Sequence, residues 1–153
     1  MSGNRRRKAF TLIEVLLVVV IMAVLAGVVV SKLMIPTEDA QLSTLLHNMH
    51  VLRSQTELYR TNHNGNYPTI QGNALPQLTS ATNSDGAIGP SGPNYPHGPY
   101  IIVMPFNPFD DSDKVTAVAT AGVKPTAVSG ALGGWQYDET TGDFWPNHPE
   151  YYE

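Results

Sequence analysis

Hydrophobic positions fall into two patterns along the chain, and the first is nearly continuous. Residues 10–35 are almost entirely apolar, with Glu14 as the one carboxylate among them. At about 1.5 Å per residue, a helix of this length can cross a hydrocarbon layer of about 30 Å. A single span in lipid has to be helical, because unpaired backbone groups are costly there. The pattern therefore predicts a membrane helix over residues 10–35.

The second pattern is periodic and predicts an amphipathic helix from about residue 37 to residue 61. Its apolar stripe recurs at spacings of three and four, and Leu46 and Leu58 widen it. The stripe consists of Leu42, Leu45, Met49, Leu52, Thr56 and Tyr59. Such a stripe is typical of a helix packed on a sheet, with a free-standing coiled coil as the alternative. With the membrane segment it predicts one helix of about 50 residues. Pro36 either kinks that helix or opens a new segment, with Thr37, Glu38 and Asp39 in its first turn.

The remainder of the chain predicts short strands between turns. Residues 100–104 form the strongest strand pattern, between Pro99 and Pro105, and residues 115–120 form a weaker one. A hairpin is expected over residues 135–145, with Gly142 in the left-handed conformation. Other expectations are a turn at 62–66, a helical turn at 75–78, a long loop at 79–99 and a terminus at 146–153 that is loose or draped on the surface. The predicted fold class is α+β: a long N-terminal helix, half transmembrane and half amphipathic, packed on a small antiparallel sheet.

Charge is distributed unevenly and sets the expected orientation. The formal net charge is −4, but four of the nine cations (Arg5, Arg6, Arg7, Lys8) precede the apolar run. The positive-inside bias places the N-terminus in the cytoplasm and the rest of the chain outside. Without residues 1–9 the balance is 5 − 13 = −8. So acidic a surface disfavours nucleic acid as a partner. The chain has no cysteine, which excludes disulfides, thiol nucleophiles and cysteine metal sites.

The start of the apolar run resembles the N-terminus of type IV pilin-like proteins, in which Phe-Thr-Leu-Ile-Glu follows a short basic leader. This resemblance implies cleavage by a prepilin peptidase between Ala9 and Phe10, where Ala9 stands in place of the family's usual Gly. It also implies methylation of the Phe10 amine. Glu14 would pair with that amine on a neighbouring subunit during filament assembly, relieving two charges that are costly in lipid. The alternatives are a secretory signal peptide, an ordinary anchor, and a Glu14 side chain that reaches interfacial water.

A second segment, residues 58–69, resembles the helix end of the major pseudopilins of type II secretion systems, where an aromatic residue, a polar stretch, Asn-Gly and Tyr-Pro follow in this order. The two resemblances imply a leader at 1–9, a transmembrane assembly helix at 10–35 and a periplasmic domain at 36–153. They imply a structural subunit in the bacterial inner membrane, in contact with lipid. Its expected partners are copies of itself in a helical filament, other pseudopilins and the inner-membrane secretion platform. The alternative is a type IV pilus subunit for adhesion or motility.

Candidate chemistry is sparse. Asp110, Asp111 and Asp113 form an acidic cluster that offers oxygen ligands to calcium, and a solvated acidic turn is the alternative. His47 and His50 lie one helical turn apart, but the sequence positions no third ligand beside them. The sequence shows no phosphate loop, nucleophile elbow or His-Glu-x-x-His motif. The expectation is therefore a protein without enzymatic activity and without a cofactor, calcium being the single candidate.

Overall fold

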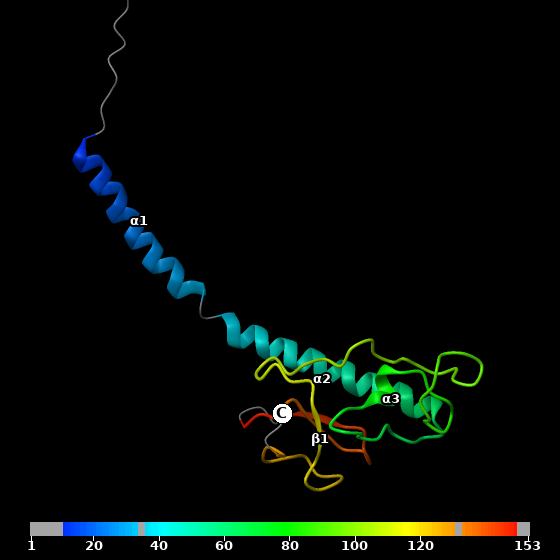
Figure 1. The fold of residues 1–153 in the computed structure, drawn as a ribbon. Helices are drawn as coiled ribbons and strands as arrows, with labels where there is room; N and C mark the ends of the chain where they lie inside the picture. The colour runs from blue at the N-terminus through cyan, green and yellow to red at the C-terminus, as the bar shows by residue number, and fades with distance from the viewer. Residues whose placement is uncertain (1–10, 34–35, 131–132, 150–153) are drawn as a thin grey trace, which may run out of the picture. The chain divides into compact units, whose positions relative to one another are not determined.

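The computed structural model describes residues 11–33, 36–130 and 133–149, and it divides into two compact units (Figure 1). The first unit is Met1–Ala40 and the second is Gln41–Glu153. Of the predicted features, the leader at 1–9 and the cleavage point at Ala9 and Phe10 lie outside the described residues. So do residues 34–35, through which the predicted single helix of about 50 residues would run.

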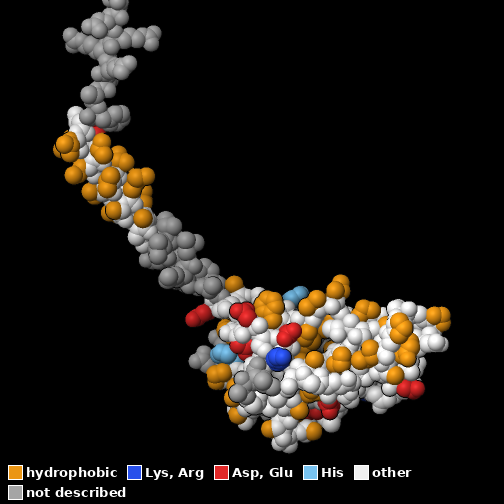
Figure 2. Space-filling model, in the orientation of Figure 1, with side chains coloured by type: hydrophobic (Ala, Val, Ile, Leu, Met, Phe, Trp, Pro, Cys, Tyr) orange, Lys and Arg blue, Asp and Glu red, His pale blue; other side chains and the backbone are white. Residues whose placement is uncertain are grey.

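The first unit is built on helix α1, Leu12–Leu33. Its side chains from Leu12 to Gly27 are all exposed, and Figure 2 shows them as an almost uniformly hydrophobic surface. Within the described stretches of the chain, no helix is both long and apolar enough to cross a membrane. The predicted membrane segment, 10–35, extends past the described part of α1 at both ends.

Helix α2, Pro36–Asn62, begins with a proline that lacks an N–H, followed by acidic residues whose charge suits a helix N-terminus. The predicted stripe is buried at its centre, from Leu45 to Tyr59. The expected widening by Leu46 and Leu58 is wrong, because both are exposed, and Leu42, the first residue of the predicted stripe, is exposed as well. The reason is size: the facing sheet has three strands of three residues each, which is too narrow to cover a broader stripe.

Three short strands form the sheet: β1 (Val115–Ala117), β2 (Trp135–Tyr137) and β3 (Phe144–Pro146), in the order β1-β2-β3. β2 and β3 pair antiparallel as the predicted hairpin, and Gly142 has the expected positive φ of 76°. β1 pairs with β2 in parallel, so the sheet is mixed where an entirely antiparallel sheet was expected. The α+β class is confirmed. β1 and β2 can pair in parallel because the connection between them is long enough to return the chain to the same end of the sheet.

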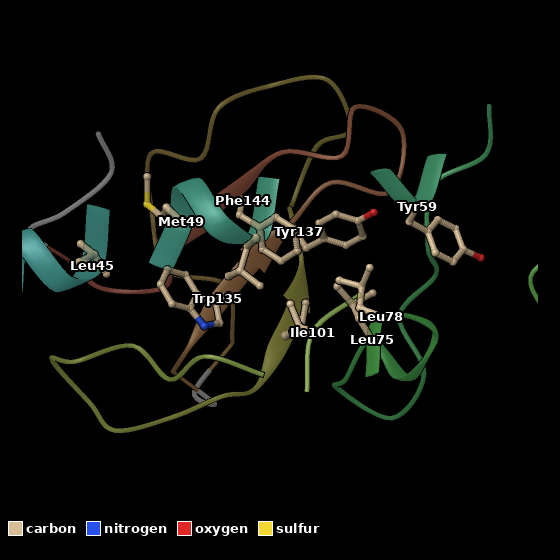
Figure 3. Packing of buried hydrophobic residues seen from close by; sticks show 11 residues of the cluster. Leu45, Met49, Tyr59, Leu75, Leu78, Ile101, Trp135, Tyr137 and Phe144 are labelled. Carbon is tan, nitrogen blue, oxygen red and sulfur yellow. The ribbon is translucent and has the colours of Figure 1, made fainter. Parts of the chain in front are cut away.

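The core lies between α2 and one face of the sheet (Figure 3). Trp135, Tyr137 and Phe144 supply the aromatic layer, and Leu75, Leu78 and Ile101 extend it. The polar ends of the aromatic residues are satisfied: Trp135 Nε1 donates to the Pro105 carbonyl at 2.8 Å, and the Tyr137 hydroxyl donates to the Pro68 carbonyl at 3.0 Å. A buried polar group without a partner would destabilise the fold, so these bonds contribute to stability. They also connect the loops to the sheet.

Loop residues cover the opposite face of the sheet, where Gln136 is fully buried. Its Nε2 donates to the Ala127 carbonyl at 2.9 Å. Asn147 exchanges hydrogen bonds with the backbone of Ser129, at 2.8 Å and 2.9 Å. The predicted loose terminus from residue 146 is therefore wrong at its start, since Pro146 belongs to β3 and Asn147 is buried. Residues 150–153 lie outside the described residues.

The strand predicted at residues 100–104 is absent, and this is the clearest correction to the sequence-based fold. The amides of Tyr100 and Ile101 both donate to the Leu78 carbonyl, so the segment does not form a ladder. Ile102 is 92% exposed and Val103 is 74% exposed. β-Branched residues favour strands only where a neighbouring strand is available, and here no strand lies alongside among the described residues. The predicted helical turn, by contrast, is confirmed as α3, Pro76–Thr79.

Candidate assembly site at the start of α1

The N-terminus of α1 is closed by a reciprocal pair of hydrogen bonds between Thr11 and Glu14. The Thr11 amide donates to Glu14 Oε2 at 2.9 Å, and the Glu14 amide donates to Thr11 Oγ1 at 3.3 Å. The Thr11 hydroxyl also donates to Oε2 at 2.9 Å. This is a capping box, which satisfies amide groups that the first turn of a helix leaves without partners.

The capping box gives Glu14 a partner within its own subunit. Its carboxylate is held at the helix N-terminus, where the peptide dipoles favour negative charge. Glu14 was predicted to pair with a neighbouring subunit, and Thr11 was not among the predicted site residues. The signal was present, because Thr-x-x-Glu ahead of an apolar run is the sequence signature of this cap. The other predicted residues of this site, Ala9 and Phe10, lie outside the described residues.

The acidic cluster after Asn107 is organised by backbone contacts. Asp110 Oδ2 accepts from the Gly134 amide at 3.0 Å, and Asp110 Oδ1 accepts from the Ser112 amide at 3.0 Å. The buried Asn107 donates from Nδ2 to the Gly134 carbonyl at 3.0 Å. Asp110 and Asn107 thus hold this turn against the residue that precedes β2. Asn107 is a structural residue that the sequence analysis did not single out.

The structure does not gather the predicted ligands into a metal site. Asp111 and Asp113 are exposed, as are His47 and His50. Within residues 11–33, 36–130 and 133–149, no three His, Asp or Glu side chains form a group that could hold a metal ion.

A second carboxylate, Asp138, is buried in the turn between β2 and β3. It accepts from the amide and hydroxyl of Thr140 at 2.8 Å and 2.6 Å, and from the amide of Gly122. Burial raises the pKa of Asp138, but these hydrogen bonds outweigh burial, so the pKa lies below its usual value. Asp138 thereby joins the hairpin turn to the crossover loop.

His63 is another buried polar residue of the globular unit, and it directly follows α2. Its Nδ1 lies 2.7 Å from the Tyr59 carbonyl and its Nε2 lies 2.9 Å from Thr82 Oγ1. Its ring stacks on the Tyr59 ring at 3.6 Å. Burial lowers the pKa of His63 and raises the pKa of Tyr59 to about 12. His63 directly follows the last residue of α2, Asn62, and lies in the turn predicted at residues 62–66.

The fold and the N-terminal site together define a pilin-like protein: a capped, apolar first helix, and a second helix packed on a small sheet. A family model for the prokaryotic N-terminal methylation motif matches residues 4–30. Type II secretion system core protein G of Escherichia coli K12 is 31% identical over 113 residues, covering 69% of this chain and 77% of that protein. The chain belongs to the family of type II secretion system core protein G.

Other core protein G sequences match over shorter stretches. The protein from Dickeya chrysanthemi is 38% identical over 68 residues, which is 44% of each chain. That from Klebsiella pneumoniae is 34% identical over 81 residues, covering 53% of this chain and 56% of its own length. No solved structure matches. Members of this family are structural subunits and not enzymes. Their prepilin-type N-terminus implies processing by a prepilin peptidase, anchoring in the inner membrane and assembly with the secretion machinery.

Proposed function

We propose that this chain is the subunit of a type II secretion pseudopilus, a filament in the periplasm that drives the export of folded proteins. The observation that carries the proposal is the Thr11–Glu14 cap, which lies within the region matched by the methylation motif. In this proposal the peptidase cuts between Ala9 and Phe10 and the Phe10 amine is methylated. The processed subunit then packs with copies of itself, with other pseudopilins and with the inner-membrane platform.

The role of Glu14 follows from its position and charge. An unpaired carboxylate costs about 2.5–3.5 kcal/mol at the centre of a membrane helix, and a smaller cost remains near the start of the helix. The capping box relieves part of this cost in the single subunit, because amide and hydroxyl donors replace water. An amine of a neighbouring subunit would add the opposite charge. We propose that the capped carboxylate is the form of Glu14 present before assembly, and that the neighbouring amine replaces one or both Thr11 contacts.

The test uses Glu14→Ala, with Glu38→Ala as a matched control, because Glu38 is an exposed glutamate in the first turn of α2. Both variants are made as full chains in the bacterium that produces the protein. We expect both to lose residues 1–9 and gain a methyl group by mass spectrometry. Only Glu14→Ala should lose filament assembly and secretion. Normal assembly by Glu14→Ala contradicts the proposed role of Glu14, and an intact N-terminus in the parent chain contradicts processing.

The proposal includes no cofactor. Asp110, the first of the three calcium candidates, accepts two backbone amides, which hold its turn. Titration of the full chain with calcium in a calorimeter tests this directly. The absence of heat at millimolar calcium supports the proposal, and saturable binding that Asp110→Asn abolishes contradicts it.

A further inference from the structure

His63 connects the end of α2 to a loop that is distant in sequence. This loop, residues 80–100, is held by isolated bridges in place of strands. His63 Nε2 lies 2.9 Å from the Thr82 hydroxyl oxygen, and Asn62 Nδ2 donates to the Tyr100 hydroxyl at 3.1 Å. Asn62 is half-buried, whereas His63 is only 1% exposed. A buried group that can titrate therefore makes one of the contacts that hold the loop on α2.

The hydrogen bonds of His63 select its neutral form. Nδ1 lies 2.7 Å from the Tyr59 carbonyl oxygen, which can only accept, so the ring proton is on Nδ1. Nε2 then accepts from the Thr82 hydroxyl. A second proton, on Nε2, would point at this hydroxyl and force it to act as an acceptor. Because Thr82 is 0% exposed, its hydroxyl hydrogen cannot turn to water, and protonation of the ring leaves a buried donor without its partner.

The groups around His63 also disfavour a positive charge. The titratable groups that face its ring are Tyr59 from α2, with ring centroids 3.6 Å apart, and His97 and Tyr100 from the loop, at 5.4 Å and 6.1 Å. None of the three is a carboxylate that could balance an imidazolium. Burial is the main cause that lowers the pKa of His63, and the charge that His97 gains in acid lowers it further. Protonation of His63 is therefore easier once its ring reaches water.

Thr82 connects His63 to the hydrogen bonds within the loop. The Thr82 amide donates to the His97 carbonyl at 2.8 Å, and the His97 amide donates back to the Thr82 carbonyl at 3.1 Å. Beside them, the Gly89 amide donates to the Ala81 carbonyl at 3.0 Å. Displacement of Thr82 from His63 disturbs these bonds together. Because they are few and lie in turns, the loop can open at a lower free energy than the whole domain.

We propose that His63 is a pH-sensitive latch: when its ring takes up a proton, residues 81–98 open away from the end of α2 while the sheet stays folded. The latch is a property of the globular unit and does not depend on the proposed function. An exposed histidine has an ordinary pKa of about 6.5. Below this pH, opening takes up one proton, so the equilibrium shifts toward the open loop by up to about tenfold for each pH unit.

Hydrogen–deuterium exchange of the detergent-extracted full chain tests the latch. Exchange is followed by mass spectrometry at pH 7.5, 6.5 and 5.5, and each rate is divided by the intrinsic rate at the same pH. We expect the protection of peptides covering residues 81–98 to fall by up to about tenfold between pH 6.5 and pH 5.5. Peptides covering residues 135–146 should keep their protection, because β2 and β3 stay paired.

Two variants identify the titrating residue. His63→Gln can still donate to the Tyr59 carbonyl and accept from the Thr82 hydroxyl but does not titrate, so its loop should stay protected at pH 5.5. His97→Gln is the matched control, because it removes the other histidine of the pair and should leave the acid-induced loss in place. An equal loss in His63→Gln, or an unchanged loop in the parent chain, overturns the proposal.

A titration of the parent chain followed by nuclear magnetic resonance keeps the test decisive if His63→Gln loosens the loop at every pH. The signals of the His63 ring should titrate below the ordinary pKa of histidine, in step with the loss of loop protection. A His63 ring that titrates at or above pH 6.5, or loss of protection in residues 135–146 at the same pH as in the loop, contradicts a local latch.

Discussion

Leu52 and Leu46 offer a direct test of how α2 meets the sheet, because they are the same residue type on the same helix. Leu52 is 0% exposed in the core, whereas Leu46 is 49% exposed. Truncating a buried leucine to alanine removes its transfer free energy and leaves a cavity, at a cost of about 2–5 kcal/mol. Leucine and alanine have similar helix propensities, so Leu46→Ala should change the free energy of unfolding by less than about 0.5 kcal/mol.

Urea unfolding of the detergent-extracted chain, followed by tryptophan fluorescence, measures this difference. The chain's only tryptophans, Trp135 and Trp145, lie in β2 and β3 and report on the globular unit alone. A loss of about 3 kcal/mol lowers the urea midpoint by roughly 1–3 M at the slopes usual for small domains. Equal midpoints for Leu52→Ala and Leu46→Ala would refute the assigned packing face of α2.

Three further predictions concern the polar and glycine positions of the globular unit. Because the pKa of Asp138 is lowered on folding, its carboxylate stabilises the fold above about pH 4, and this contribution is lost as the pH falls further. Asp138→Asn should lower the free energy of unfolding by about 1–3 kcal/mol near neutral pH, measured by urea unfolding. Because the pKa of His63 is also lowered on folding, the free energy of unfolding falls as the pH drops below about 6.5. His63→Gln should remove this fall, so that the urea midpoint changes less with pH in the variant than in the parent chain. Gly142→Ala should destabilise more than Gly130→Ala, since both have positive φ but only a Cβ at Gly142 would lie 2.3 Å from the Tyr67 ring; equal unfolding midpoints would contradict this.

Sequence patterns predicted the elements whose residues interact locally. The α2 stripe, the hairpin around Gly142 and the turn before Ser80 each follow from spacing, turn chemistry or capping. The failures involve partners distant in sequence. Residues 100–104 have strand composition, but among the residues that the structure describes no strand pairs with them. The parallel pairing of β1 likewise depends on the path of the long crossover, which no local pattern encodes.

The residues of the candidate site show the same difference between local signals and partners distant in sequence. Glu14 was identified from its position in the apolar run, while Thr11 could have been identified from the Thr-x-x-Glu spacing and was not. Asn107 and His63 had no such signal. Each is buried because of contacts with residues 27 and 19 positions away, at Gly134 and Thr82. Polar residues of this kind resemble ordinary surface residues until the tertiary contacts are known.

Whether the chain serves protein export is decided by a clean deletion in the native bacterium. The measurement compares the extracellular proteome and the surface filaments of the deletion strain with those of the parent, and a plasmid copy of the chain provides the control. We expect loss of secreted proteins with surface pili unchanged, and restoration of secretion by the plasmid. Loss of pili with secretion intact would contradict it and would identify the chain as a type IV pilus subunit.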